Sequence, residues 1–165
     1  MKKVNDHYAL SEATMALEYA KVEHYESIIY DVNDTYYSTQ SNQTLINEAC
    51  LEQNTTYETK KEISRIKFKH QMKPPFIICA LKGIYFIPTM SPTSPDNIWI
   101  NPRHVISVSE DPFPTLTLTN GYKLKINCSI HTYEKQVERA QIQLYYHIPD
   151  ILWELFRKNR LIDLF

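Results

Sequence analysis

Residues 73–104 constrain the fold more than any other stretch, because short apolar runs alternate there with residues that interrupt regular structure. Strands are predicted at 76–81 and 84–87, joined by a tight turn that contains one of the few glycines. The segment 88–97 then carries three prolines, which fix backbone angles and remove donors from a strand ladder. The chain leaves this turn through an Ile-Trp-Ile run, in which Trp99 is expected to anchor the core.

Residues 115–127 predict a β-hairpin, and its register follows from hydrophobic matching. The two-residue turn that an Asn-Gly pair usually forms would place Leu118 opposite Lys123. A three-residue loop places Leu118 opposite Tyr122 instead, so that apolar residues face apolar residues. We therefore predict the longer loop, with Gly121 left-handed in a bulge.

This register also predicts what the outward face of the hairpin carries. Thr115 and Thr117 share that face with Lys123 and Lys125. Two threonines beside two lysines form a polar, cationic strip, which suits either water or a phosphate backbone.

The other elements are predicted from periodicity, capping residues and turn residues. The segment 60–70 is expected to begin as a helix end and to pass into a strand over 65–69. We expect further strands at 25–32, 35–39 and 105–110. Helices are expected at 9–22, at 43–51 behind a Ser41-Asn42 cap, from about 129 to a stop at Pro149, and briefly around 151–156.

These elements predict a single α+β domain over residues 1–165. Its antiparallel, partly closed β-sheet would be built from about residue 25 to residue 127, with N-terminal and C-terminal helices packed against it.

Several classes of protein are excluded or disfavoured by composition. With only Gly83 and Gly121 in the chain, neither a phosphate-binding loop nor a dinucleotide-binding turn can form, since both need clustered glycines. Cys50, Cys79 and Cys128 are far apart and odd in number, which predicts buried free thiols in a reducing compartment. The start of the chain lacks a secretory signal pattern, and no apolar run approaches the ~20 residues of a membrane helix. We expect a cytoplasmic protein with no membrane partner.

Catalysis has little support in the sequence. The six histidines are scattered, and none has the spacing of a zinc site. A Cys79 nucleophile with His70 as its base would rest on residue type alone. We expect no enzymatic activity, no metal and no cofactor.

The charge is unevenly distributed along the chain. Residues 1–59 carry three basic and ten acidic side chains, a net charge of −7, whereas residues 60–165 carry fifteen basic and nine acidic ones, a net charge of +6. An acidic first part and a basic body favour a charged partner, although solvated faces of both signs explain the same pattern equally well.

Charge and expected facing indicate which basic residues could contact DNA phosphates. An extended segment from Arg65 to Lys69 would point its odd-numbered residues one way. An arginine held on a rigid turn after Pro102 could enter a narrow minor groove, although a loop-tip charge is the simpler interpretation. The candidate DNA-binding residues are Arg65, Lys67, Lys69, His70, Lys73, Arg103, His104, Lys123, Lys125 and Arg139.

Five short motifs in order resemble the competence transcription factor (ComK) family of low-GC Gram-positive bacteria. They are KPPF, IYFIPTMSPTSP, IWI followed by HV, and LTNGYKLKI, with Ser129, Tyr133, Gln136 and Arg139 beyond them. The resemblance is best over residues 57–144. It is weak over the acidic residues 1–56 and faint over 145–165, where a C-terminal helix is expected.

The resemblance implies a transcription activator of DNA-uptake genes. Such a protein would bind AT-rich promoter DNA mainly through the minor groove, as a homodimer or a dimer of dimers. It would also be delivered by an adaptor to an AAA+ protease. An alternative is a degenerate paralogue that acts as a protein-interaction module and titrates the adaptor or an active partner; an acidic first part and a shortened C-terminus would fit that alternative as well.

Overall fold

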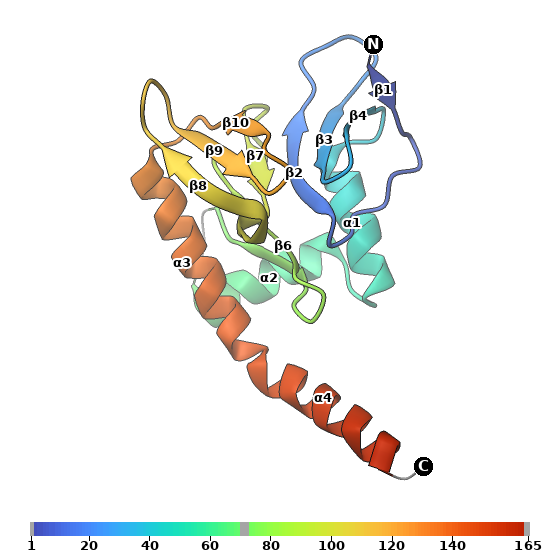
Figure 1. Ribbon diagram of the computed structural model, residues 1–165. Helices are drawn as coiled ribbons and strands as arrows, with labels where there is room; N and C mark the ends of the chain where they lie inside the picture. Colours follow the sequence, from blue (N-terminus) through green and yellow to red (C-terminus); the bar gives the residue numbers. More distant parts are fainter. Residues whose placement is uncertain (1, 70–72, 164–165) are drawn as a thin grey trace.

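The computed structural model describes residues 2–69 and 73–163 (Figure 1). Seven strands form the larger sheet, and all neighbours are antiparallel except β1 and β4, which are parallel. In spatial order the strands are β1 (Lys3–Val4), β4 (Thr35–Ser38), β3 (Ser27–Asp31), β2 (Thr14–Tyr19), β7 (Ile98–Ile100), β6 (Ile84–Pro88) and β5 (Phe76–Cys79).

A smaller antiparallel sheet has the order β10-β9-β8. Its strands are β8 (Val105–Ser109), β9 (Thr115–Leu118) and β10 (Lys123–Lys125), and a short 3₁₀ turn, η1 (Pro102–His104), leads into them. The helices are α1 (Asn42–Glu52), α2 (Tyr57–Phe68), α3 (Ile130–Tyr146) and α4 (Ile148–Asp163). The predicted α+β class is confirmed, with the strands divided between two sheets.

The central strands of the larger sheet are buried on both faces, and each face has its own core. Phe86 and Trp99 lie in the core shared with α1 and α2, which we call the helix-side core. Ile87 and Ile100, their neighbours along the chain, lie in the core shared with the smaller sheet and α3, which we call the sheet-side core. Alternation along β6 and β7 therefore supplies both cores at once. Trp99 is 3% exposed, as expected of a core anchor.

The helix predicted over 9–22 is wrong, because this part of the chain contains β2. The strand lies between β3 and β7 in the larger sheet. An irregularity in its pairing after Thr14 lets Met15 and Ala16 both serve the sheet-side core, while Leu17 turns to the helix-side core. A centrally buried strand needs no polar face, and the bulge also breaks the period of two that would have identified it.

The hairpin prediction is confirmed in detail. Leu116 pairs with Leu124, and the Leu118 N–H donates to the Tyr122 carbonyl at 2.8 Å. Gly121 has φ +87°, the left-handed conformation expected of the bulge.

Helix starts were predicted better than helix ends. The Ser41 side chain caps α1 and the Ser129 side chain caps α3, each accepting from a backbone N–H three residues on. The strand predicted over 65–69 is wrong, however, because α2 continues through Phe68 and ends at a left-handed Lys69. The helix that begins at Ile130 does end before Pro149, at Tyr146, as predicted. Pro149 itself lies in the first turn of α4, which starts earlier and runs further than the short helix expected around 151–156.

Candidate nucleic-acid interface

A cleft of about 330 Å³ lies between Lys73 and the first half of α3, and we call it the α3 cleft. Four of its six lining residues carry a basic side chain, and none is acidic. The lining residues are Lys73, His131, Thr132, Lys135, Gln136 and Arg139. A concave surface with several cationic groups and no carboxylate can accept a phosphate oxygen.

Gln136 builds the cleft from inside the protein. Its side chain is 2% exposed, and its amide Nε2 donates to the carbonyls of Lys73 and Pro88, both at 2.9 Å. Its Oε1 accepts from Arg139 Nη1 at 3.2 Å. One buried amide therefore attaches the Lys73 segment and the end of β6 to α3, and it orients the arginine. Because this hydrogen bond uses only part of the guanidinium, donors remain for a ligand.

Two of the cationic side chains around the cleft form no ion pair with another described residue. Lys135 pairs with Glu138 at 3.4 Å on the exposed face of α3, whereas Lys73 and Arg139 have no ion pair within the described part of the chain. Burial raises the pKa of the Cys128 thiol, and the positive charge of Lys73 opposes this increase. The Lys73 charge therefore acts near the start of α3.

The predicted Thr/Lys strip lies on the outer face of the smaller sheet. Lys123 pairs with Thr117 and Lys125 with Thr115, and all four side chains are at least partly exposed. Ser107 and Ser109 on β8 pair with the same threonines and extend the polar face. The Lys125 ammonium lies 4.0 Å from the centre of the Phe113 ring, a cation–π contact that holds one end of the strip.

The basic residues of α2 do not form the single row that an extended segment would have formed. In a helix, residues two positions apart point in nearly opposite directions, so Arg65 and Lys67 lie on different sides. Arg65 is also paired with Glu62, with Nη2 2.5 Å from Oε1. Lys67 is exposed beside the end of α3, Lys69 caps α2, and His70 lies outside the described residues.

Arg103 and His104 are both engaged within the chain. The Arg103 guanidinium donates to the Lys82 carbonyl at 2.9 Å. The His104 ring is 3.0 Å from Thr119 Oγ1 and 2.6 Å from the Glu12 carbonyl, so it connects the segment before β2 to the end of β9. These contacts join the turn to three other segments of the chain, and a role of Arg103 and His104 in DNA binding stays a prediction.

Two cleft residues, His131 and Lys135, were not among the candidates from the sequence. With Arg139 they recur every four residues, which places all three along one side of a helix. That periodicity was available in the sequence, but the approach of Lys73 to the same helix face was not.

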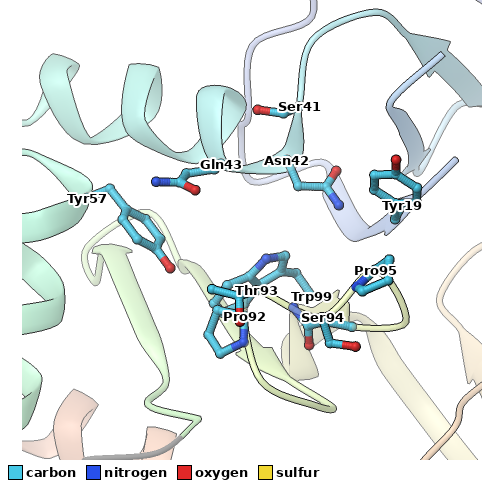
Figure 2. A pocket seen from close by; sticks show the side chains of 11 residues that line it. Tyr19, Ser41, Asn42, Gln43, Tyr57, Pro92, Thr93, Ser94, Pro95 and Trp99 are labelled. Atoms are coloured by element: carbon cyan, nitrogen blue, oxygen red, sulfur yellow. The ribbon is translucent and has the colours of Figure 1, made fainter. Parts of the chain in front are cut away.

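The pocket in Figure 2 does not resemble a phosphate site. It has a volume of about 370 Å³, and its lining residues are all uncharged; they come from β2, the starts of α1 and α2, residues 92–95 and 97, and β7. Among the described residues, no group of three metal-ligating side chains comes together. None of the described helices is both long and apolar enough to span a bilayer.

A family model described as ComK protein matches residues 5–150, most of the chain. The chain belongs to the ComK family. This is a family of competence-related transcription factors. Comparisons with curated proteins and with solved structures returned no match. The matched range of this ComK chain includes both the acidic first part and every residue of the α3 cleft.

Proposed function

We propose that this ComK-family chain activates competence genes by binding AT-rich promoter DNA, with the α3 cleft as its main phosphate contact. The observation that carries the proposal is the grouping of Lys73, Lys135 and Arg139 around an acid-free concavity whose arginine is held by a buried amide. Phosphate contacts supply much of the affinity of DNA-binding proteins.

The minor groove is the proposed route of sequence recognition. AT-rich tracts have a narrow minor groove with an enhanced negative potential, so a protein can select them through groove shape with few base-edge contacts. A modest set of cations is enough for that mode of binding. The Thr/Lys strip of the smaller sheet is proposed as a second phosphate contact.

Family membership also motivates three finer proposals. The chain would work in the cytoplasm, would bind promoters as a dimer or a dimer of dimers, and would be delivered by an adaptor to an AAA+ protease. Stabilisation of the purified protein against such a protease when the adaptor is omitted would support the last of these.

The test is fluorescence anisotropy on an AT-rich duplex and a GC-rich control across a salt series. The variant Lys73→Ala/Arg139→Ala should weaken AT binding and reduce the slope of log K against log salt by roughly 1.8, about 0.9 for each lost phosphate contact. Lys3→Ala, a lysine on β1 in the acidic part of the chain, is the matched control and should bind as the wild type does.

Three outcomes separate the alternatives. An unchanged slope in the double variant would reject the α3 cleft, and Lys123→Ala/Lys125→Ala would then test the strip. Failure of a minor-groove ligand to displace the protein would reject the groove assignment. Equal weak binding to both duplexes, or none, would favour the interaction-module alternative.

A further inference from the structure

The uncharged pocket in Figure 2, which we call the α1 pocket, has no role in the proposed function. It lies between the start of α1 and the loop that carries residues 92–95, and its volume of about 370 Å³ is in the range of small-molecule sites. The start of a helix is not by itself a binding site. This one, however, faces buried aromatic side chains that carry polar groups.

Two buried aromatic side chains bring polar atoms to the α1 pocket. Tyr57, at the start of α2, is 7% exposed, and Trp99, in the middle of β7, is 3% exposed. The Tyr57 ring stacks on Phe76, with the ring centres 4.7 Å apart, and Figure 2 shows its hydroxyl directed toward Pro92 and Trp99. Neither the Tyr57 hydroxyl nor the Trp99 indole N–H forms a hydrogen bond with a described residue. Since buried polar groups are normally hydrogen-bonded, we expect both to bond to a molecule in the pocket.

Amide side chains on α1 add polar groups from another wall of the pocket. Asn42 and Gln43, in the first turn of α1, form no side-chain hydrogen bond with the described residues, and Asn42 Oδ1 is buried without a partner. An amide carries both donors and an acceptor, so rotation of the group can present either to a ligand. The amide of Asn97 is already used, because its Oδ1 accepts from the N–H groups of Thr89 and Met90 and so holds the loop in place.

The lining of the α1 pocket excludes several kinds of ligand. No lining residue is charged, so an ionised ligand would lose its hydration there without gaining a counter-charge. A sugar ring or a proline-rich peptide packs on exposed aromatic faces. Tyr57 and Trp99 are buried and present little of their rings. Of the three aromatic residues that line the pocket, only Tyr19 is well exposed, at 44%.

A flat, neutral nitrogen heterocycle matches what remains. Its ring would stack on Tyr19, and the donors and acceptors along its edge would bond to the Tyr57 hydroxyl, the Trp99 N–H and the Asn42 amide. Proteins bind unstacked nucleobases in this way, with an aromatic side chain on the ring face and hydrogen bonds along the ring edge. Burial raises the pKa of Tyr57, so its hydroxyl stays protonated and remains a donor at neutral pH.

We propose that the α1 pocket binds an uncharged nucleobase, free or as its nucleoside. The pocket and the α3 cleft have no lining residue in common, so the proposal does not depend on DNA binding. A ligand that binds only the folded chain also stabilises it, so occupation of the pocket should raise the unfolding temperature.

The experiment is isothermal titration calorimetry of the full chain, without DNA, against adenosine, guanosine, cytidine and uridine, and against free adenine and uracil. At least one should bind with a dissociation constant below about 1 mM. Tyr57→Phe removes the hydroxyl and keeps the stacked ring, and it should raise that constant by roughly threefold to tenfold. Tyr36→Phe makes the same change on β4, outside the pocket, and is the matched control that should bind as the wild type does.

Two further measurements separate binding from folding. Tyr19→Ala, at an exposed position at the end of β2, should weaken binding by roughly fivefold or more, as expected for the loss of one base–aromatic stack. Without ligand, Tyr57→Phe should unfold at the same temperature as the wild type, because its hydroxyl bonds to no described residue. The monophosphate of the nucleoside that binds should bind no more tightly than the nucleoside, since the lining offers no cation.

Three results would overturn the proposal. They are the absence of binding by every base and nucleoside, binding that neither tyrosine variant weakens, and markedly tighter binding of the monophosphate. The Lys73→Ala/Arg139→Ala variant should bind the nucleoside as the wild type does, whether or not it binds DNA. Failure of the DNA proposal and failure of the nucleobase proposal therefore give different results.

Discussion

Gln136 shows how much one buried polar side chain does in this fold. Its amide satisfies two backbone carbonyls from distant segments and accepts from Arg139. Hydrogen bonds of this kind contribute modestly when made, but breaking them leaves buried groups unsatisfied at a larger cost. Gln136 therefore stabilises the fold and positions a residue of the proposed interface.

The substitution Gln136→Leu should lower the free energy of unfolding by about 2 kcal/mol, because the Lys73 and Pro88 carbonyls lose their donor. Chemical denaturation measures the change. Gln141→Leu makes the same chemical change on the exposed side of α3 and should be nearly neutral. Equal losses in the two variants would mean that the buried amide has no special role.

His147, at the junction of α3 and α4, should make stability depend on pH. Burial lowers its pKa below the ordinary 6.5, and the charges of Lys60 and Lys67 lower it further, while Asp150 opposes them. The unfolded chain therefore takes up this proton at a higher pH than the folded chain does. Stability is lost as the pH falls below about 6.5, and none is lost through this group at higher pH.

The measurement is the difference in unfolding free energy between the wild type and His147→Gln at about pH 8 and about pH 5.5. The variant should gain stability relative to the wild type at the lower pH. Gln141→Leu, which removes no titratable group from the exposed side of α3, is the control and should show no such gain. A pH-independent difference for His147→Gln would contradict the prediction.

At the scale of elements, two turns use glycine for different reasons. Gly121 has φ +87° with open space where a Cβ would lie, so Gly121→Ala should cost only backbone strain, about 1 kcal/mol. Gly83 has φ +70°, and a Cβ there would overlap the Arg103 guanidinium. Gly83→Ala should also break the Arg103 bond to the Lys82 carbonyl and cost about 1 kcal/mol more.

Thermal or chemical denaturation of the two glycine variants should therefore rank Gly83→Ala as the more damaging. Repeating both in an Arg103→Ala background should remove the difference, because the clash and the lost hydrogen bond both involve Arg103. If the difference persists without the arginine, its cause lies elsewhere in the turn.

At the scale of the whole molecule, the larger sheet contributes side chains to both cores. Phe86 is fully buried in the helix-side core, and its neighbour Ile87 is 1% exposed in the sheet-side core. Damage to either core therefore weakens the sheet on which the other core is built. The two cores should unfold together rather than as separate units.

We expect Phe86→Ala and Ile87→Ala each to lower the unfolding free energy by about 3 kcal/mol. Both should shift a single transition, seen equally by far-UV circular dichroism and by the fluorescence of Trp99, in a Trp153→Phe background. Two resolved transitions in either variant would show that the cores unfold separately.

The sequence by itself determined the features that depend on near neighbours. The register of the 115–125 hairpin follows from matching apolar residues across a short loop, and the helix caps at Ser41 and Ser129 follow from side chains that reach the next turn. The α+β class, the strands on either side of Gly83 and the core position of Trp99 follow for the same reason.

Only the tertiary structure decided the rest. The local sequence of residues 14–19 predicts a helix, but these residues form a strand because strands flank them on both sides and a core packs on each face. The local sequence of residues 65–68 predicts extended chain, but these residues belong to α2. Lys73 and Arg139 line the same cleft because Gln136, buried in α3, donates to the Lys73 carbonyl and accepts from Arg139. In sequence, the apolar surface of α4 likewise resembles a face that packs into a core. In the structure, the body of the protein packs without covering that surface, so it is exposed. In each case the deciding contact joins residues distant in the chain, and local periodicity carries no information about such contacts.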